Sequence, residues 1–377
     1  MKLRETFLSK QWQGLLKTSI VALLMISLSV GLSGAWWDFG EEETSYRQSR
    51  LPQGNAITDP TAILRYALPI ENNTIRKLQQ SLEDIANELR GKRWSPISRD
   101  VKEASRYLGS SDKILASIPN QYQPQAESLL AQMKDEVSQL REAVDAQDKE
   151  EVWTLRREIL AQITDLERFM VEEFPFEVPT EYANLPQLKG RATVEMETNK
   201  GNLVLVVDGY NSPVTAGNFV DLVEKGFYNG LPFIRAEDNY ILQTGDPEGV
   251  EEGYIDPQTG EYRAIPLEIK IRSELEPIYG NTLEELGLYR EETVLPISAY
   301  GALGMARPGN EPNGGSSQFF FFLFEPALAP AGLNLLDGRY AVFGYTVEGK
   351  EVLEQLRAGD EIISAKVVEG LDNLVKS

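Results

Sequence analysis

One arginine stands between two short apolar runs in the stretch LPFIRAEDNYILQTGD, residues 231–246. The runs PFI and YIL are rich in aromatic and β-branched residues, and the polar letters EDN separate them. This pattern predicts two buried strands joined by a turn. Such a hairpin would hold Arg235 beside Tyr240 and Ile241, as a cationic donor at the rim of an apolar pocket. From this stretch alone, Arg235 could equally be an ordinary surface arginine on an edge strand.

The composition limits the chemistry that this arginine could serve. The chain of 377 residues has no cysteine and no histidine. Thiol nucleophiles, histidine-based triads, disulfides and the usual zinc ligands are therefore excluded, and we expect neither a metal nor a cofactor. Any reaction must use arginine, glutamine, carboxylates, hydroxyls or the backbone. The net charge of -21 argues against nucleic acid as a partner, because phosphate binding requires a basic surface.

Three segments resemble the signature motifs of the cyclophilins and occur in that family's order. Two of them are MARPGNEPNGGSSQFFFFLF at residues 305–324 and LLDGRYAVFGYTVEG at residues 335–349. The other lies in the opening stretch, where the F-x-R, aromatic and Q-x-G-D positions are occupied by Phe233, Arg235, Tyr240, Gln243, Gly245 and Asp246. The resemblance covers residues 191 to about 370.

The resemblance implies a peptidyl-prolyl cis-trans isomerase that acts on proline-containing proteins or peptides. Rotation about the bond before proline faces a barrier of about 20 kcal/mol. Catalysis requires an apolar pocket for the proline ring, a grip on the flanking carbonyl, and a fixed donor to the prolyl nitrogen as it becomes pyramidal. Arginine suits the last task because it stays charged and its fork is rigid. The reaction needs no acid, base or nucleophile, which fits a chain without histidine or cysteine.

The resemblance also implies a role for each matching site residue. Arg235 would be the catalytic donor, and Gln243 would orient it and contact the substrate. The peptide would be held by Gln318 and by the backbone at Arg307. The remaining substrate-binding residues, most of them lining the proline pocket, would be Tyr240, Ile241, Ala306, Phe320, Leu336 and Tyr340.

Several of these positions depart from the family pattern. Tyr240 stands where the family has phenylalanine, Ile241 where it has methionine, and Tyr340 where it has histidine. Arg307 replaces an asparagine beside the groove, and Leu335 replaces the tryptophan that contacts cyclosporin. The pattern predicts weak drug binding and a pocket altered enough to lower activity, although the minimal catalytic set is kept.

Before residue 173, apolar residues repeat at helical spacing, which predicts an antiparallel bundle. Gly91 would end the first helix, Gly109 would divide a weaker helix or helix pair at 101–118, and Asp148 would cap the last helix. Such stripes are far more typical of a core than of a cofactor site. The stripes are Ile75, Leu78, Leu82, Ile85 and Leu89; then Leu129, Met133, Val137, Leu140 and Val144; then Val152, Leu155, Ile159, Ile163, Leu166 and Met170.

The first residues of the chain indicate export. A basic start is followed by an apolar run at 19–32 and by the small residues SGA at 33–35, as in a signal peptide. An uncleaved membrane anchor is the alternative, but the apolar run is short for a membrane span. The residues themselves predict only export across a membrane, to a periplasm or, as the family resemblance implies, to a thylakoid lumen.

The whole pattern predicts an α+β multidomain chain, with an N-terminal antiparallel helical bundle followed by a cyclophilin-like closed antiparallel eight-stranded β-barrel with flanking helices. A loop rich in acidic residues lies within the second domain. It is either only a solvated loop, or it has a specific role, such as binding a basic partner or bridging the two domains. The expected segments are a signal peptide or anchor at 1–35, a flexible lead at 36–60, the bundle at 61–173, a proline-rich linker at 174–190, and the cyclophilin-like domain at 191–377 with the acidic insertion at about 247–275.

This combination resembles the multidomain thylakoid-lumen cyclophilins of oxygenic phototrophs, a family associated with the assembly and repair of photosystem II. The resemblance implies photosystem II subunits as partners. Two functions remain open: a working isomerase that assists protein folding, favoured by Arg235, or a catalytically weak chaperone or binding module for a membrane-protein loop. Tyr340, Arg307 and the insertion favour the second function.

Overall fold

The computed structural model describes residues 57–171, 174–237, 240–250, 252–288, 290–324 and 336–376. The expected signal peptide, most of the lead that follows it, and Leu335 lie outside these ranges. Within them, no helix combines the length and the apolar character that crossing a lipid bilayer requires.

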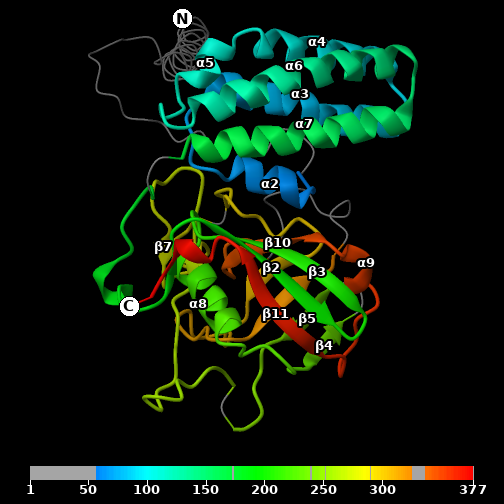
Figure 1. Cartoon of the computed structure of the whole chain (residues 1–377). Coiled ribbons are helices and arrows are strands. Elements are labelled where there is room, and N and C mark those ends of the chain that lie inside the picture. The colour runs from blue at the N-terminus through cyan, green and yellow to red at the C-terminus, as the bar shows by residue number, and fades with distance from the viewer. Residues whose placement is uncertain are drawn as a thin grey trace, which may run out of the picture. The chain divides into compact units, whose positions relative to one another are not determined.

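The helical part of the chain contains the bundle that the apolar stripes predict (Figure 1). Its apolar side chains form one core to which every predicted stripe contributes. The second stripe needs one correction, because Leu130 is fully part of that core while Leu129 is only partly buried. The helices are α3 Asn73–Arg90, α4 Trp94–Leu108, α5 Ser111–Leu115, α6 Gln123–Asp145 and α7 Lys149–Phe169.

The predicted helix ends are confirmed. Gly91 follows α3, and Gly109 separates α4 from α5, so the weak stretch at 101–118 is a helix pair. The carboxylate of Asp148 accepts hydrogen bonds from the backbone N–H groups of Glu150 and Glu151, both at 3.1 Å. It thereby satisfies two of the donors that the start of α7 would otherwise leave without partners.

A short helix, α2 (Pro60–Tyr66), precedes the bundle and does not join its core. Its Ile63 and Leu64 belong instead to an apolar cluster with residues of the β-sheet. The carbonyl of Ala67, just after the helix, accepts a 2.9 Å hydrogen bond from the amide of Asn211. The sequence placed Pro60 in the lead and the rest of α2 in the bundle. Seven residues are too few for a pattern that would show which partner covers the apolar face of the helix.

Eight strands form the predicted antiparallel sheet, and the sheet curls back on itself (Figure 1). Backbone hydrogen bonds join its two ends, for example from Phe233 N–H to the Asp360 carbonyl at 2.8 Å and from Ile362 N–H to the Leu231 carbonyl at 3.0 Å. The strand order is β11-β2-β3-β10-β8-β9-β5-β4. The strands are β2 Arg191–Thr198, β3 Gly201–Asp208, β4 Phe233–Glu237, β5 Ile241–Thr244, β8 Ala302–Met305, β9 Phe319–Phe322, β10 Val342–Glu348 and β11 Ile362–Glu369.

The four consecutive phenylalanines of β9 are all buried, and they serve two different apolar clusters. Phe319 and Phe321 point into the interior of the sheet, whereas Phe320 and Phe322 pack on its other face. This alternation follows from the two-residue period of a strand. Strand β9 is a central strand of the sheet, because it lies between β8 and β5.

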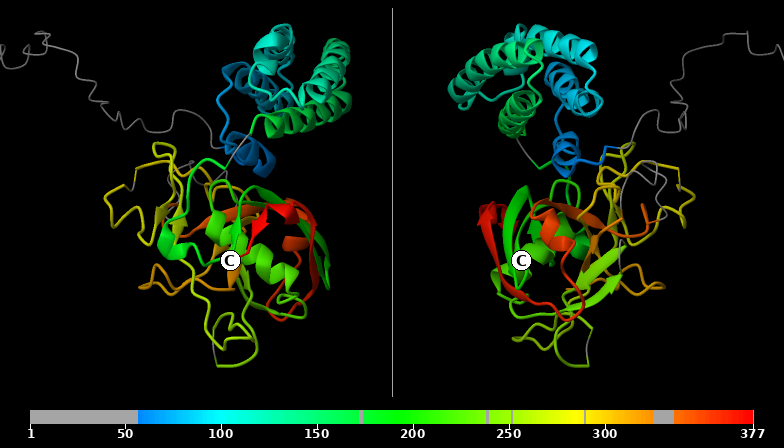
Figure 2. Two further views of the ribbon diagram at one scale, coloured as in Figure 1. Left: turned by 60° about the vertical axis from the view of Figure 1, so that its left-hand side comes forward. Right: turned by 90° about the vertical axis from the view of Figure 1, so that its right-hand side faces the viewer.

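The proline-rich segment before the sheet contains more regular structure than the sequence predicted. Strand β1 (Gln187–Leu188) pairs with β12 (Leu374–Val375), and a 3-10 turn, η1, spans Thr180–Tyr182. The end of the chain therefore lies against helix α8 (Pro213–Glu224), as Figure 2 shows. The remaining elements are β6 Glu268–Ile269, β7 Ile278–Tyr279, α9 Lys350–Leu353 and η3 Leu371–Asn373.

Candidate active site

The predicted hairpin around Arg235 is present as strands β4 and β5. Arg235 lies opposite Gln243 in the register of the two strands, after an irregularity between Phe233 and Arg235. Cross-strand partners point to the same face of a sheet. The hairpin therefore places the arginine and the glutamine together on the face that also carries Ile241 and Phe320.

The guanidinium of Arg235 is bound by an acid that the family motifs do not assign to the site. Its Nε donates to Glu237 Oε1 at 2.7 Å, and its NH2 group donates to the same oxygen. Both side chains are about half exposed, at 51% and 45%. The resemblance implied that Gln243 orients Arg235, but the residue that binds the guanidinium is Glu237. Glu237 lies two residues further along the same strand and carries the opposite charge.

Gln243 instead takes part in a chain of side-chain amides. Its Nε2 donates to Gln318 Oε1 at 2.7 Å, and Gln318 Nε2 donates to Asp246 Oδ1 at 3.0 Å and to the Glu252 carbonyl at 3.2 Å. Burial and then the nearby Glu252 carboxylate raise the pKa of Asp246, while the bond from Gln318 opposes them. The chain fixes both glutamine side chains at the floor of the groove.

A groove of about 450 Å³ contains four of the predicted site residues. They are Gln243, Ala306, Arg307 and Gln318, and they come from three different strands or strand ends. The backbone N–H of Ala306 donates to the Gln318 carbonyl at 3.0 Å, which holds the two walls together. The groove could accept an extended peptide beside Arg235.

An apolar cluster adjoins this groove, and Ala306 belongs to both. Ile241 and Phe320 are buried in the same cluster, with Ala306, Leu336 and Tyr340 packed against it. These are the residues that the resemblance assigns to the proline pocket. Tyr240 lies at the rim, 38% exposed, with its ring edge-on to Phe322 at 6.1 Å between centroids.

Two departures from the family pattern contact each other. The Arg307 guanidinium lies over the Tyr340 ring at 5.4 Å, and its NH2 group donates to the Arg339 carbonyl at 2.8 Å. Tyr340 in turn meets Phe320 edge-on at 5.3 Å. Arg307 is therefore held at the groove wall by a cation–π contact and a hydrogen bond, and the two substitutions act as one unit.

The structure brings the predicted residues together around one face, but it does not place them all in one cavity. Arg235 and Tyr240 lie at the outer edge of that face. Glu237 and Asp246 were not predicted as site residues. The sequence pattern placed Glu237 in the turn after the first strand, whereas it is the last residue of β4 and lies on the same face as Arg235. In the part of the chain that the structure describes, no cluster of acidic side chains could hold a metal ion.

Two family models match separate parts of the chain. Residues 59–171 match the PsbQ-like domain of CYP38-like peptidyl-prolyl cis-trans isomerases, and residues 193–372 match the cyclophilin type peptidyl-prolyl cis-trans isomerases. The two models together cover both the helical core and the curled sheet.

The chain is also similar over most of its length to named proteins. A Synechocystis protein named as a thylakoid lumen peptidyl-prolyl cis-trans isomerase is 58% identical, over 96% of this chain and 95% of its own. The chloroplastic isomerase CYP38 of Arabidopsis thaliana is 44% identical over 86% of this chain and 77% of its own, and chloroplastic CYP37 is 31% identical over 94% and 79%. The chain belongs to the cyclophilin-type peptidyl-prolyl cis-trans isomerases, in the group that joins a PsbQ-like helical domain to a cyclophilin domain.

Proposed function

We propose that Arg235 catalyses cis-trans isomerisation of X-Pro bonds in client polypeptides. The observation that carries this proposal is the position of Arg235 opposite Gln243, on the face that carries the apolar cluster around Phe320. A proline ring packed on that cluster would bring its nitrogen within reach of the guanidinium. The arginine would donate to the nitrogen most strongly when the bond is twisted, since the lone pair is then no longer delocalised.

The other site residues would hold the peptide while the bond rotates. Gln243 and Gln318 are held by their own hydrogen bond and would offer their remaining polar groups to the peptide backbone. Ile241, Phe320 and Leu336 would enclose the ring. Only the twisted state gains the bond from Arg235, so the barrier falls without any proton transfer.

We further propose that the protein works in a thylakoid lumen and assists the assembly or repair of photosystem II. The location is supported by the names of the two relatives with the highest identity given above, and by the export signal that the sequence predicts. The photosystem II role rests on the resemblance to multidomain lumenal cyclophilins. Affinity capture of the full chain from thylakoid membranes tests it, with Arg235→Ala as the reference. Enrichment of photosystem II subunits supports this role, and their absence from both samples contradicts it.

One observation favours a second function, that of a chaperone or binding module with little turnover. Glu237 occupies the fork of Arg235, and Arg307 fills part of the groove wall. Both would slow an isomerase without preventing a peptide from binding.

Isomerisation of a short Ala-Pro peptide by the full chain distinguishes the two functions. Arg235→Ala should abolish the activity, and Lys366→Ala, an exposed cation on β11, should leave it unchanged. If the wild-type chain is no faster than Arg235→Ala but binds the peptide equally well, the site is a docking site and the isomerase proposal fails.

A further inference from the structure

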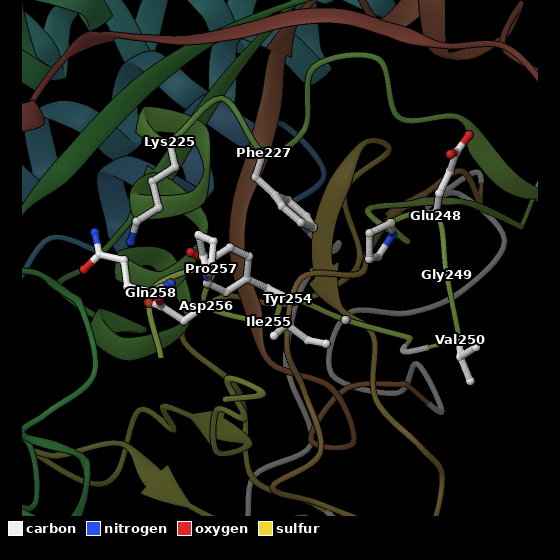
Figure 3. A pocket seen from close by; sticks show the side chains of 12 residues that line it. Lys225, Phe227, Glu248, Gly249, Val250, Tyr254, Ile255, Asp256, Pro257 and Gln258 are labelled. Atoms are coloured by element: carbon white, nitrogen blue, oxygen red, sulfur yellow. Dashed lines mark hydrogen bonds between the residues drawn. The ribbon is translucent and has the colours of Figure 1, made fainter. Parts of the chain in front are cut away.

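A second cavity, of about 760 Å³, lies where the acidic insertion passes the end of helix α8 (Figure 3). We call it the insertion pocket. Loop residues 247–250 and 253–258 form most of it, together with Lys225 and Phe227 after the helix. None of the residues assigned to the reaction lines it.

The middle of the insertion pocket is apolar and rigid. The rings of Phe227 and Tyr254 meet edge-on at 5.3 Å between centroids, and Tyr254 is only 5% exposed. Its backbone N–H donates to the Ser316 hydroxyl at 3.0 Å, and Arg263 covers its ring at 4.7 Å. The wall is thus held by contacts with the sheet domain.

The charge of the pocket favours a cation. Two carboxylates line it, Glu248 and Asp256, against one ammonium group, Lys225. Lys225 Nζ lies 2.5 Å from the Asp221 carboxylate, which Arg263 shares at 2.7 Å, and Glu248 lies at the other end of the pocket from Lys225 in Figure 3. Hydrogen bonds from the backbone of the 256–259 turn hold the pKa of Asp256 below its ordinary value, so it stays ionised at neutral pH.

The insertion pocket and the groove that contains Gln243 share one lining residue. Val250 lines both cavities and is 95% exposed. In Figure 3, Glu248 and Val250 lie at one end of the pocket, and Lys225 and Gln258 lie at the other. A peptide that leaves the groove along Val250 would therefore pass Glu248 before it reaches the aromatic wall.

We propose that the insertion pocket is a second peptide subsite, which binds a lysine or arginine side chain of the same client whose proline lies at Arg235. The long aliphatic stem of such a residue would pack on Phe227, and its charged head would reach Glu248, since Asp256 lies at the end of the pocket that holds Lys225. The inference rests on the proposed function in one respect, that the proline lies at Arg235.

A series of labelled peptides tests the subsite on the full chain by fluorescence anisotropy. Each peptide carries one Ala-Pro core and a Gly-Ser spacer of about two to eight residues, since an extended residue spans about 3.3–3.6 Å. The spacer ends in Arg-Leu or, in the matched peptide, in Glu-Leu. We expect one spacer length at which the Arg-Leu peptide binds about fivefold tighter than the Glu-Leu peptide.

Charge-reversal variants test whether Glu248 is responsible for the tighter binding of the Arg-Leu peptide. Glu248→Lys should reduce the ratio of the two affinities to about one or below, and Val250→Ser should lower it partly. Glu354→Lys, which changes an exposed acid outside the pocket, should keep the ratio of the wild-type chain. A ratio that survives Glu248→Lys, or one that is near one at every spacer length, overturns the subsite.

A failure of the subsite can be distinguished from a failure of the proposed function. Arg235→Ala should abolish isomerisation of the short peptide while the Arg-Leu preference in binding persists. An active wild-type enzyme without that preference rejects the subsite alone. Preference without activity in the wild-type chain rejects the isomerase alone.

Discussion

At the scale of single residues, the site is tuned by charges that the reaction itself does not need. Arg235 must offer its N–H groups to the substrate, yet Glu237 already accepts from two of them. The contact between Arg307 and Tyr340 likewise adds a fixed cation to the groove wall. The ion pair and the cation–π contact both restrict side chains that face the groove. Neither contact is required by the fold, because all four residues are at least partly exposed.

Release of Arg235 from Glu237 should raise the isomerase activity. An exposed ion pair contributes about 0.2–1 kcal/mol, so Glu237→Gln should increase kcat/KM for a short peptide by up to about fivefold. Salt should increase the wild-type rate toward that of the variant, because it screens the pair. Isomerisation rates at low and high ionic strength measure both effects. Glu354→Gln serves as the control, and a slower Glu237→Gln enzyme would mean that the acid positions the arginine productively.

At the scale of elements, the pocket depends on a close approach between two strands. Gly304 on β8 lies opposite Phe320 on β9, and a Cβ at position 304 would stand 2.4 Å from the end of the Phe320 ring. A glycine at position 304 therefore leaves the space that the Phe320 ring occupies. The backbone requires no unusual dihedral there, so the constraint is purely one of space.

Gly304→Ala should push the Phe320 ring into the space that a proline would occupy. Overpacking of this kind costs about 1–3 kcal/mol. We expect weaker binding of a short proline peptide together with a lower thermal midpoint. Gly309→Ala is the matched control, since a Cβ there would meet nothing within 4 Å. If Gly304→Ala binds the peptide as well as the control does, the pocket floor lies elsewhere.

The cap of helix α7 offers a second test at this scale. Removal of the Asp148 carboxylate should cost about 1 kcal/mol of helix stability, because two N–H groups lose their partner. Asp145→Ala, three residues earlier, should cost nothing, since an acid at the C-terminal end of α6 opposes the helix dipole. Denaturation followed by far-UV circular dichroism compares the two variants. Equal losses would contradict the assignment of Asp148 as a cap.

Periodicity predicted the long elements well and the short ones poorly. The stripes of α3, α6 and α7 run over several turns each. By contrast, α2 and β1 are too short for a pattern, and their partners lie far away in sequence. The motif positions predicted which side chains share the site face, but the contact of Arg235 with Glu237 depends on rotamers that no spacing encodes.

At the scale of the whole molecule, buried carboxyl groups make the stability of the fold depend on pH. Burial raises the pKa of Glu167 in α7 to about 7, although Arg76 lies 3.0 Å away and opposes this rise. Burial likewise raises the pKa of Glu268 to about 7, although it accepts from the backbone N–H of Thr215 at 2.9 Å. The two acids lie in different parts of the fold, so both the helical bundle and the sheet domain share this property.

The fold should therefore lose stability as the pH rises from about 4.5 to about 8. Both acids have pKa values in the folded state above their ordinary values. In this pH range the folded state therefore binds more protons than the unfolded state, and a rising pH destabilises it. A tenfold difference in proton affinity between the folded and unfolded states corresponds to about 1.4 kcal/mol for each acid. Thermal unfolding of the full chain between pH 5 and pH 8 measures the trend.

Two matched variants assign this pH dependence to the buried acids. Glu268→Gln removes one of the two groups and should flatten the curve of stability against pH. Glu354→Gln changes the net charge equally but lies at the surface, so it should leave the slope intact. A wild-type chain more stable at pH 8 than at pH 5 would mean that the bonds from Thr215 and Arg76 keep both carboxylates ionised.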